Sequence, residues 1–295
     1  MRKAVLIACL SSRHAAEYYG QAQKLLTERG FELEAHTAKS KKALRKRVRA
    51  LIKAGHRLIL VAGGDGSQTC VVGEFAHRDA VLGVIPAGTG NSFAMGLGIG
   101  ESLQEAIDVI VDGKVASIDL GRAGKTYFAN FSTIGLASNI GNDTNHLLKS
   151  VLGPVAYGLA AVGPILTHKY FRARVKWDGN VSKLKTHQII VANGRDYGHQ
   201  PIAPDATFTD KRLSFFASSG TSRIDILKTY VALMRGRQQE LNEAQYFSAR
   251  KIKISTRPRV IIDIDGNDLG RTPVKFSVAP AALRVMVPQS FGETA

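Results

Sequence analysis

The sequence is poor in cysteine and proline and has no long apolar run, and each shortage excludes a class of protein. Its two cysteines, Cys9 and Cys70, are too few for a disulfide framework or a cysteine-rich zinc site. With 9 prolines among 295 residues and a hydrophobic fraction of 44%, the composition is that of a folded globular chain. No stretch reaches the roughly 18 uninterrupted apolar residues that a membrane-spanning helix needs. We therefore expect a cytoplasmic protein in which any membrane contact is peripheral, at the inner face.

Acidic residues are also scarce. The chain has 24 Asp and Glu against 40 Lys and Arg, which gives a net charge of +16 and favours anionic partners. Residues 39–53 concentrate basic side chains on an amphipathic helix, which could contact an anionic membrane or could simply be solvated. Nucleic acid is not expected, because no aromatic residues interleave with these charges and no reading motif is present. The sequence gives no indication of oligomeric state.

The first part of the chain alternates predicted strands and helices, which indicates a parallel sheet covered on both faces. Apolar residues at helical spacing predict helices over 39–53 and 102–112, and short apolar runs predict strands at 57–62 and 81–85. We expect an α/β domain over residues 1–119, to which residues 286–295 could return.

After about residue 117 the pattern changes to short β-rich segments separated by turn residues, such as Asp178-Gly179-Asn180 and Asp265-Gly266-Asn267. Two helices are predicted within this part, near 145–168 and 222–235, and a strand is predicted over 127–131. The pattern indicates a second, mainly β domain over residues 120–285.

The sequence Gly63-Gly64-Asp65-Gly66-Ser67 lies between a predicted strand and a predicted helix. Glycines there let the backbone turn sharply and bring its N–H groups close to an anion such as phosphate. A carboxylate in such a loop would repel bare phosphates, so Asp65 is suited to hold Mg²⁺ or to accept a proton from an attacking hydroxyl. The alternative interpretation is a plain glycine-rich turn in which Asp65 caps the helix.

A second glycine-rich loop, Pro86-Ala87-Gly88-Thr89-Gly90-Asn91, follows the next predicted strand. Loops at the carboxyl ends of neighbouring parallel strands form the crevice in which open α/β sheets bind ligands. Neither loop fits the dinucleotide fingerprint of Rossmann folds. The phosphate-binding motif of P-loop proteins is absent as well, because Asp119 replaces the first glycine of the only partial match, Gly124-Lys125-Thr126.

Together these loops, residues 63–67 and 86–94, resemble the diacylglycerol kinase and sphingosine kinase catalytic family, especially its bacterial soluble lipid kinases. The resemblance extends through Ile118-Asp119-Leu120-Gly121, Asn193-Gly194-Arg195 and the C-terminal segment from Asp263 to Pro288. It implies a transferase of lipid metabolism, such as phospholipid biosynthesis, with two domains, ATP and Mg²⁺ as cofactors, and a lipid substrate between the domains.

The resemblance also implies roles for individual residues of this chain. Asp65, Asp265 and Asp268 are the candidate catalytic residues, and Asp119 would organise Mg²⁺ and water. A further magnesium site would lie in the loop that follows Pro204-Asp205-Ala206. The candidates for that metal site are Asp210, Asp119, Thr207 and Arg212, and those for nucleotide binding are Thr37, Gly63, Gly64, Asp65, Gly66, Ser67, Gln68, Thr69, Gly88, Thr89 and Asn91.

The sequence departs from the family pattern at a chemically important position. The family's final motif reads Asp-Gly-Glu, with the glutamate as proton acceptor, whereas this chain has Asn267 there. Because an amide cannot accept the proton of a hydroxyl, Asp265, Asp268 or Asp65 would have to replace it. Three hypotheses follow: an ATP-dependent lipid kinase, a weakly active or inactive member that binds nucleotide or lipid as a sensor or partner, and, less favoured, an NAD kinase.

Overall fold

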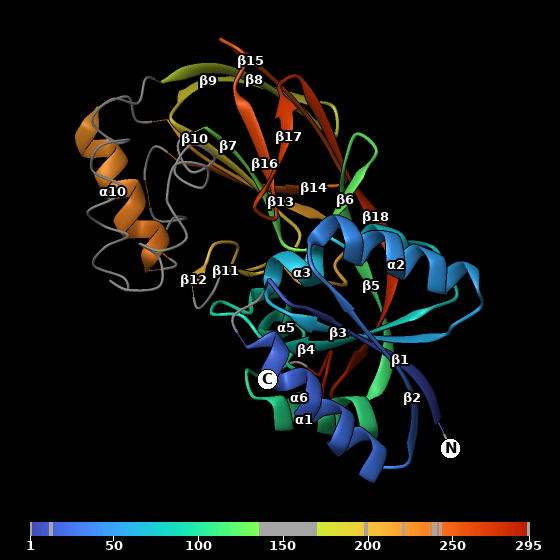
Figure 1. The fold of residues 1–295 in the computed structure, drawn as a ribbon. Coiled ribbons are helices and arrows are strands. Elements are labelled where there is room, and N and C mark those ends of the chain that lie inside the picture. Colours follow the sequence, from blue (N-terminus) through green and yellow to red (C-terminus); the bar gives the residue numbers. More distant parts are fainter. Residues whose placement is uncertain are drawn as a thin grey trace.

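The computed structural model describes residues 2–11, 14–135, 170–197, 200–219, 222–235, 237, 241 and 244–293. It consists of an α/β half and a β-sandwich half, stacked along the long axis of the molecule (Figure 1). This arrangement confirms the predicted fold class.

The α/β half is built on four parallel strands in the order β2-β1-β3-β4. Their bounds are Arg2–Cys9 for β1, Phe31–Ala38 for β2, Leu58–Gly63 for β3 and Val81–Pro86 for β4. The last six residues of β1 and all six of β4 are buried, as expected for central strands covered on both faces.

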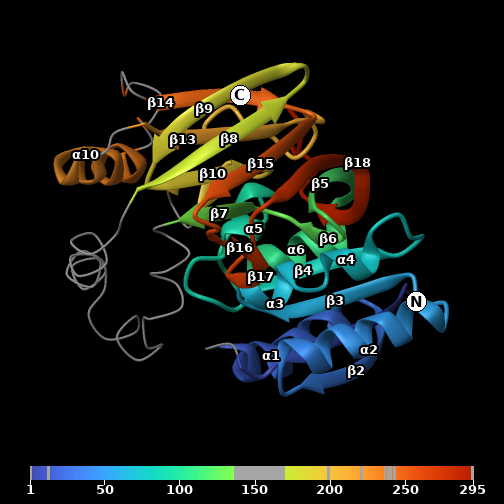
Figure 2. The same cartoon turned by 90° about the horizontal axis from the view of Figure 1, so that it is seen from above.

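Helices cover both faces of this sheet (Figures 1 and 2). The helices α1 (Ala15–Glu28) and α6 (Leu103–Asp112) pack their apolar sides on one face, and α2 (Lys41–Lys53) and α4 (Val72–Phe75) pack on the other. Ser102 and Glu105 form a capping box at the start of α6. Two short helices, α3 (Asp65–Thr69) and α5 (Ser92–Gly96), follow the glycine-rich loops.

Two long strands carry the same sheet into the second half of the molecule. β18 (Val274–Val287) pairs in parallel with β4 at Arg284 and Val285, and its earlier residues pair antiparallel with β15 (Lys251–Arg257). β5 (Lys114–Ala123) runs antiparallel to β18 and continues into β6 (Thr126–Phe128). With β8 (Phe171–Trp177) and β9 (Asn180–Thr186) they complete a ten-stranded sheet.

The C-terminal part of this sheet packs against a six-stranded sheet in the order β14-β13-β10-β7-β16-β17. The core between the two sheets is apolar and includes Phe128, Phe215, Ile252 and Phe276. The six strands are β7 (Phe131–Gly135), β10 (Gln188–Ala192), β13 (Leu213–Ser218), β14 (Ala244–Ala249), β16 (Ile261–Ile264) and β17 (Asn267–Arg271), and β11 (Asp196–Tyr197) pairs separately with β12 (Gln200–Pro201).

Two predicted elements need adjustment. The strand predicted over 127–131 is interrupted after Phe128, because the N–H groups of Ala129, Asn130 and Phe131 bind a carboxylate rather than a neighbouring strand. The helix predicted near 222–235 is α10 (Arg223–Met234), whereas the one near 145–168 lies outside the described residues. Within the described ranges, no helix has both the length and the apolarity to cross a bilayer.

Candidate active site

The two glycine-rich loops are in direct contact. β3 and β4 are neighbours with Gly63 opposite Pro86, so both loops leave the same edge of the sheet. A Cβ atom built on Gly88 would lie 2.6 Å from the Cα of Gly64, which is closer than a real side chain can approach. Only glycine at both positions allows this approach, and it brings the two loops into one crevice.

We expect Gly88→Ala to lower the free energy of unfolding by about 1–3 kcal/mol, since the added methyl group overpacks two backbones. Gly20→Ala is the matched control, because Gly20 lies within α1 and a Cβ there meets nothing within 4 Å. That control should be neutral or up to about 1 kcal/mol stabilising. Urea unfolding of both variants tests the contact, and equal stability of the two would contradict it.

Asp65 connects the two loops electrostatically. Its Oδ1 accepts a hydrogen bond from the backbone N–H of Phe93 at 3.0 Å. Burial raises the pKa of Asp65 above its usual value, although the hydrogen bonds from Phe93 and Ser92 act in the opposite direction. The alternative role, a cap on the helix that Asp65 itself begins, is not what the structure shows, because the carboxylate binds the start of α5 instead.

Asn91, Gln68 and Thr69 use their side chains within the loops. Asn91 has a left-handed φ of 44° and exchanges two hydrogen bonds with Gly88, at 3.0 and 3.2 Å. The Gln68 amide donates to the carbonyl of Gly63, and the Thr69 hydroxyl donates to the carbonyl of Asp65. All three side chains are buried, so they hold the backbone of the loops in place on the side that faces away from solvent. Thr37 and Thr89 are exposed at the edge of the sheet where strands β2 and β4 end.

A hairpin turn from the β-sandwich faces this crevice. Asp265 and Gly266 join β16 to β17 with φ values of 47° and 78°. A two-residue type I′ hairpin turn requires positive φ at both of its central residues. The Asp265 carboxylate accepts hydrogen bonds from the backbone N–H groups of Ala129, Asn130 and Phe131 at 2.9–3.1 Å. Burial raises the pKa of Asp265 to about 7, and repulsion from Asp65 adds to this effect.

Asp65 and Asp265 thus form a pair of carboxylates, one from each half of the molecule. Within the described ranges, no group of three or more His, Cys, Asp or Glu side chains could hold a metal ion. Mg²⁺ does not need such a group, because it binds through one or two carboxylates, several waters and the phosphates of the substrate. Two partly buried carboxylates that repel each other beside a glycine-rich loop fit that requirement.

Lys41 is a residue of the site that the sequence did not single out. It is the first residue of α2, and a Cβ built on Gly66 would lie 2.6 Å from its Nζ atom. The same Nζ donates to Oδ1 of Asn267 at 3.4 Å. The ammonium group therefore lies between the first glycine-rich loop and the hairpin, and no carboxylate in the described part of the chain is within ion-pair distance of it.

Asn267 and Asp268, the next residues of the hairpin, bind mainly within it. The Asn267 amide donates to the carbonyls of Ile264 and Asp265, and Oδ1 of Asp268 accepts from the N–H of Gly270. Asp268 is exposed on β17. Of the candidate catalytic residues, the structure thus brings Asp65 and Asp265 together and shows Asp268 only in a contact with its own strand.

The predicted second metal site forms another cluster. Asp119 is buried and its two oxygens accept the N–H groups of Lys211 and Ala281. Asp210 accepts the N–H groups of Thr207 and Arg212, and burial together with repulsion from Asp119 raises its pKa. Asp119, Asp210, Thr207 and Arg212 therefore lie close together, with the two side chains of Thr207 and Arg212 exposed. Metal binding by this cluster stays a prediction.

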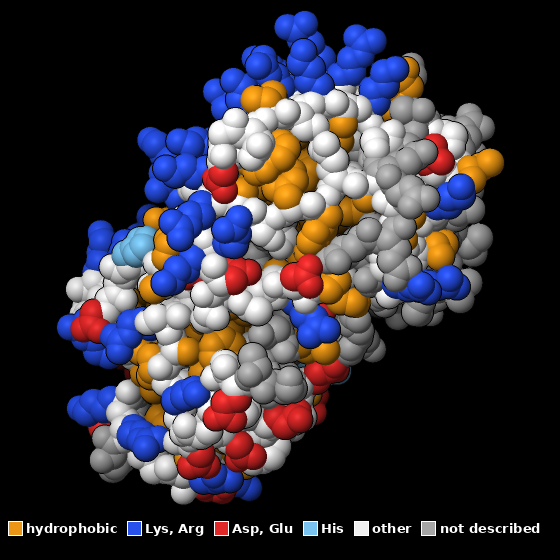
Figure 3. Space-filling view, turned by 180° about the vertical axis from the view of Figure 1, so that it is seen from behind, with side chains coloured by type: hydrophobic (Ala, Val, Ile, Leu, Met, Phe, Trp, Pro, Cys, Tyr) orange, Lys and Arg blue, Asp and Glu red, His pale blue; other side chains and the backbone are white. Residues whose placement is uncertain are grey.

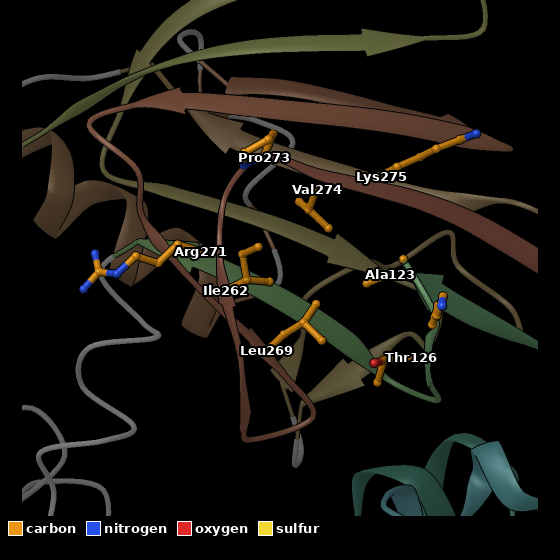
Figure 4. Close-up of a pocket in the computed structure, with 10 residues that line it drawn as sticks. Ala123, Thr126, Ile262, Leu269, Arg271, Pro273, Val274 and Lys275 are labelled. Carbon is orange, nitrogen blue, oxygen red and sulfur yellow. The ribbon is translucent and has the colours of Figure 1, made fainter.

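A pocket of about 270 Å³ lies elsewhere, between the β5–β6 and β16–β17 hairpins (Figure 4). Ile262 and Leu269 point into it, and its rim carries Arg271 and Lys275. None of the candidate site residues lines it. It is therefore separate from the crevice at the glycine-rich loops.

Comparison with protein families decides the affiliation of the chain. The diacylglycerol kinase catalytic domain matches residues 4–123, and the YegS C-terminal NAD kinase beta sandwich-like domain matches residues 132–287. The second match alone covers more than half of the chain, which therefore belongs to the family with the YegS C-terminal domain, here preceded by a diacylglycerol kinase catalytic domain. Both glycine-rich loops lie within the first match, and Asp265 and Asn267 lie within the second.

Relatives within this family align over most of their length. A diacylglycerol kinase of Staphylococcus epidermidis is 27% identical over 268 residues, which cover 90% of this chain and 84% of the relative. One of Staphylococcus aureus is 28% identical over 255 residues, covering 85% and 81%.

Solved structures show the same fold. A diacylglycerol kinase of Bacillus anthracis str. Sterne superimposes with a TM-score of 0.75 at 20% identity, over 98% of both chains. A second protein of that organism, assigned provisionally to the same activity, gives a TM-score of 0.83 at 24% identity, over 98% of this chain and 96% of its own.

Proposed function

We propose that this family member is an ATP- and Mg²⁺-dependent kinase that transfers the γ-phosphate to a lipid hydroxyl. The observation that carries the proposal is the convergence of three segments: the loop around Gly64, the loop around Gly88, and the hairpin turn at Asp265. The names of the relatives point to a diacylglycerol-like acceptor, and a sphingoid acceptor has the same hydroxyl chemistry.

Phosphoryl transfer depends chiefly on positioning and on neutralising negative charge. Gly64 and Gly66 have no side chains, so a phosphate could approach the backbone around them closely, with the ammonium group of Lys41 beside Gly66. Asp65 would hold Mg²⁺, which would supply positive charge beside the phosphates. The side chains of Gln68, Thr69 and Asn91 are turned inward and form hydrogen bonds within the loops.

A proton must leave the lipid hydroxyl during transfer, and Asn267 cannot take it. Asp265 is better suited than Asp268, because its pKa of about 7 allows it to accept a proton near neutral pH and because it faces Asp65. One of its oxygens accepts a single backbone N–H, from Ala129, which leaves room for a further contact. In this proposal Asp65 binds the metal and Asp265 receives the proton.

Lys41 would contribute a positive charge to the transferred phosphate. We expect Lys41→Gln to lower kcat/KM for ATP by roughly 10- to 100-fold, which corresponds to about 1.4–2.7 kcal/mol. Lys42→Gln is the matched control, since Lys42 is the next residue of α2 and is exposed. Steady-state kinetics of both variants test the role, and equal kinetics would contradict it.

The second candidate function is a member that binds nucleotide or lipid without transfer, and the observation that favours it is Asn267. A third, NAD kinase, shares the first glycine-rich loop. One assay separates them: incubate the purified protein with γ-labelled ATP, Mg²⁺ and either a mixed lipid extract or NAD. Label in the lipid phase supports the kinase proposal, and label only in NADP supports NAD kinase. Nucleotide binding without label in either acceptor favours the sensor.

A further inference from the structure

The outward face of the sheet formed by β9, β8, β15 and the start of β18 has charged side chains of one sign only. Each strand alternates between buried apolar and exposed basic residues. On β8, for example, Phe171, Ala173 and Val175 are buried, while Arg172, Arg174 and Lys176 are exposed. We call this surface the basic sheet face, and it consists of Arg172, Arg174, Lys176, Lys183, Lys185, Lys251, Lys253, Arg257 and Lys275.

Strand pairing places these charges directly opposite one another. Arg172 lies between Lys185 on β9 and Arg257 on β15, and Arg174 lies opposite Lys183. Lys253 lies between Lys176 on β8 and Lys275 on β18. In the space-filling view, Lys and Arg side chains gather at the end of the molecule where Figure 1 shows β8, β9 and β15 (Figure 3).

Like charges directly opposite each other on paired strands destabilise a sheet. The strands that form the face contain no acidic residue that would offset this cost. Asp178, the acidic residue that follows β8 in the chain, lies in the β8–β9 turn and accepts the N–H of Arg250. Among the described residues, none of the basic side chains of this face forms an ion pair. An external anion would compensate for this arrangement.

We propose that the basic sheet face binds the surface of an anionic lipid bilayer. A broad sheet face matches a flat array of headgroups, and apolar groups lie at its edge. Val181, opposite Lys176, is 52% exposed, and Tyr170, whose ring lies 5.6 Å from Lys185 Nζ, is 45% exposed. An exposed tyrosine beside cations is typical of membrane interfaces. The preference for lipid over nucleic acid rests on the proposed lipid kinase function.

The helix α2 is the competing basic surface, and much of its charge is used elsewhere. Arg45 and Arg49 both bind the buried carboxylate of Glu74, at 2.9–3.3 Å, and Lys41 lies at Gly66 of the first glycine-rich loop. This leaves fewer cations of α2 available to a bilayer than the predicted pattern over 39–53 suggested.

The test is vesicle sedimentation of the full chain without ATP, on phosphatidylcholine vesicles with and without phosphatidylglycerol. We expect binding only when phosphatidylglycerol is present, weakening with salt. The triple variant Lys176→Gln, Lys253→Gln, Lys275→Gln should bind the vesicles roughly 100-fold more weakly, because each basic residue near the surface raises the binding constant about fivefold. The matched control, Lys39→Gln, Lys42→Gln, Lys46→Gln on α2 and just before it, should bind within a few fold of the wild type.

Thermal melting separates lost binding from lost folding, since removing opposed like charges should leave the sheet variant at least as stable as the wild type. Three results would overturn the proposal: no phosphatidylglycerol-dependent binding of the wild type, loss of binding in the α2 control instead, or tighter binding of a DNA duplex than of the vesicles. Since no phosphate is transferred in this assay, its outcome is independent of whether the chain is a kinase.

Discussion

Replacing Asp65 by Asn is expected to reduce phosphoryl transfer roughly 1,000-fold, or about 4 kcal/mol of transition-state stabilisation, because the metal-binding charge is lost. The fold should survive, since the amide oxygen of the substituted side chain can still accept the N–H of Phe93 that now binds Asp65 Oδ1. The melting temperature should stay equal or rise, because burial and its neighbour Asp265 both disfavour a charge at this position.

Initial rates with γ-labelled ATP and thermal melts measure the two effects separately. Asp108→Asn is a suitable control, because Asp108 is an exposed carboxylate on α6 that pairs with Arg29, away from the loops. Activity of the Asp65 variant within tenfold of the wild type would exclude a role for this carboxylate in transfer.

Replacing Asp265 by Ala is expected to lower the free energy of unfolding by about 4 kcal/mol. The change leaves three backbone N–H groups, those of Ala129, Asn130 and Phe131, without their acceptor. It also places alanine at a φ of 47°, a left-handed conformation that Asp and Asn tolerate better than alanine because their side chains can form local hydrogen bonds. Asp265→Asn should cost less, about 2 kcal/mol, because the amide oxygen keeps part of the acceptor capacity and asparagine tolerates this φ.

Chemical denaturation of the two variants gives these free energies, with Asp268→Asn as the control on the same hairpin. Asp268 is exposed and binds only the N–H of Gly270 in the described contacts. Its substitution should therefore change the free energy of unfolding by less than about 0.5 kcal/mol. Equal effects at the two positions would contradict the anchoring role of Asp265.

The raised pKa of Asp265 also predicts the direction of a pH effect. The folded state holds this proton up to about pH 7, whereas the unfolded chain releases it near the usual value of 3.8. The folded state therefore binds more protons between these values, and the contribution of Asp265 to stability decreases as the pH rises from about 4 to about 7. The stability difference between the wild type and Asp265→Asn, measured across this range without Mg²⁺, should narrow accordingly.

The sequence was sufficient for the features that depend on local chemistry. Strand and helix periodicity predicted the α/β half, and the glycines at 63, 64, 66 and 88 predicted tight loops at strand ends, because backbone geometry and hydrophobic spacing are encoded within short segments. The ordered motifs predicted the family, which the domain matches confirm.

The roles of Asp265 and Lys41 required the tertiary structure. The acceptor role of Asp265 depends on N–H groups more than 130 positions earlier in the chain, and these same groups end the strand that the sequence predicted to continue through 131. Lys41 looked like one cation among many in a basic helix, and only the packing of α2 places its ammonium group at Gly66.

The basic sheet face is the clearest example of a feature that the sequence alone did not reveal. In the sequence, the alternating Lys and Arg residues of each segment indicate only an ordinary solvated strand face, because no single strand contains an unusual pattern. Strand pairing between residues as far apart as Arg172 and Arg257 puts the charges side by side. The sequence by itself thus determined the elements, the loops and the family, whereas the pairing of distant segments decided which charges meet, since electrostatic interactions depend on distance in space and not along the chain.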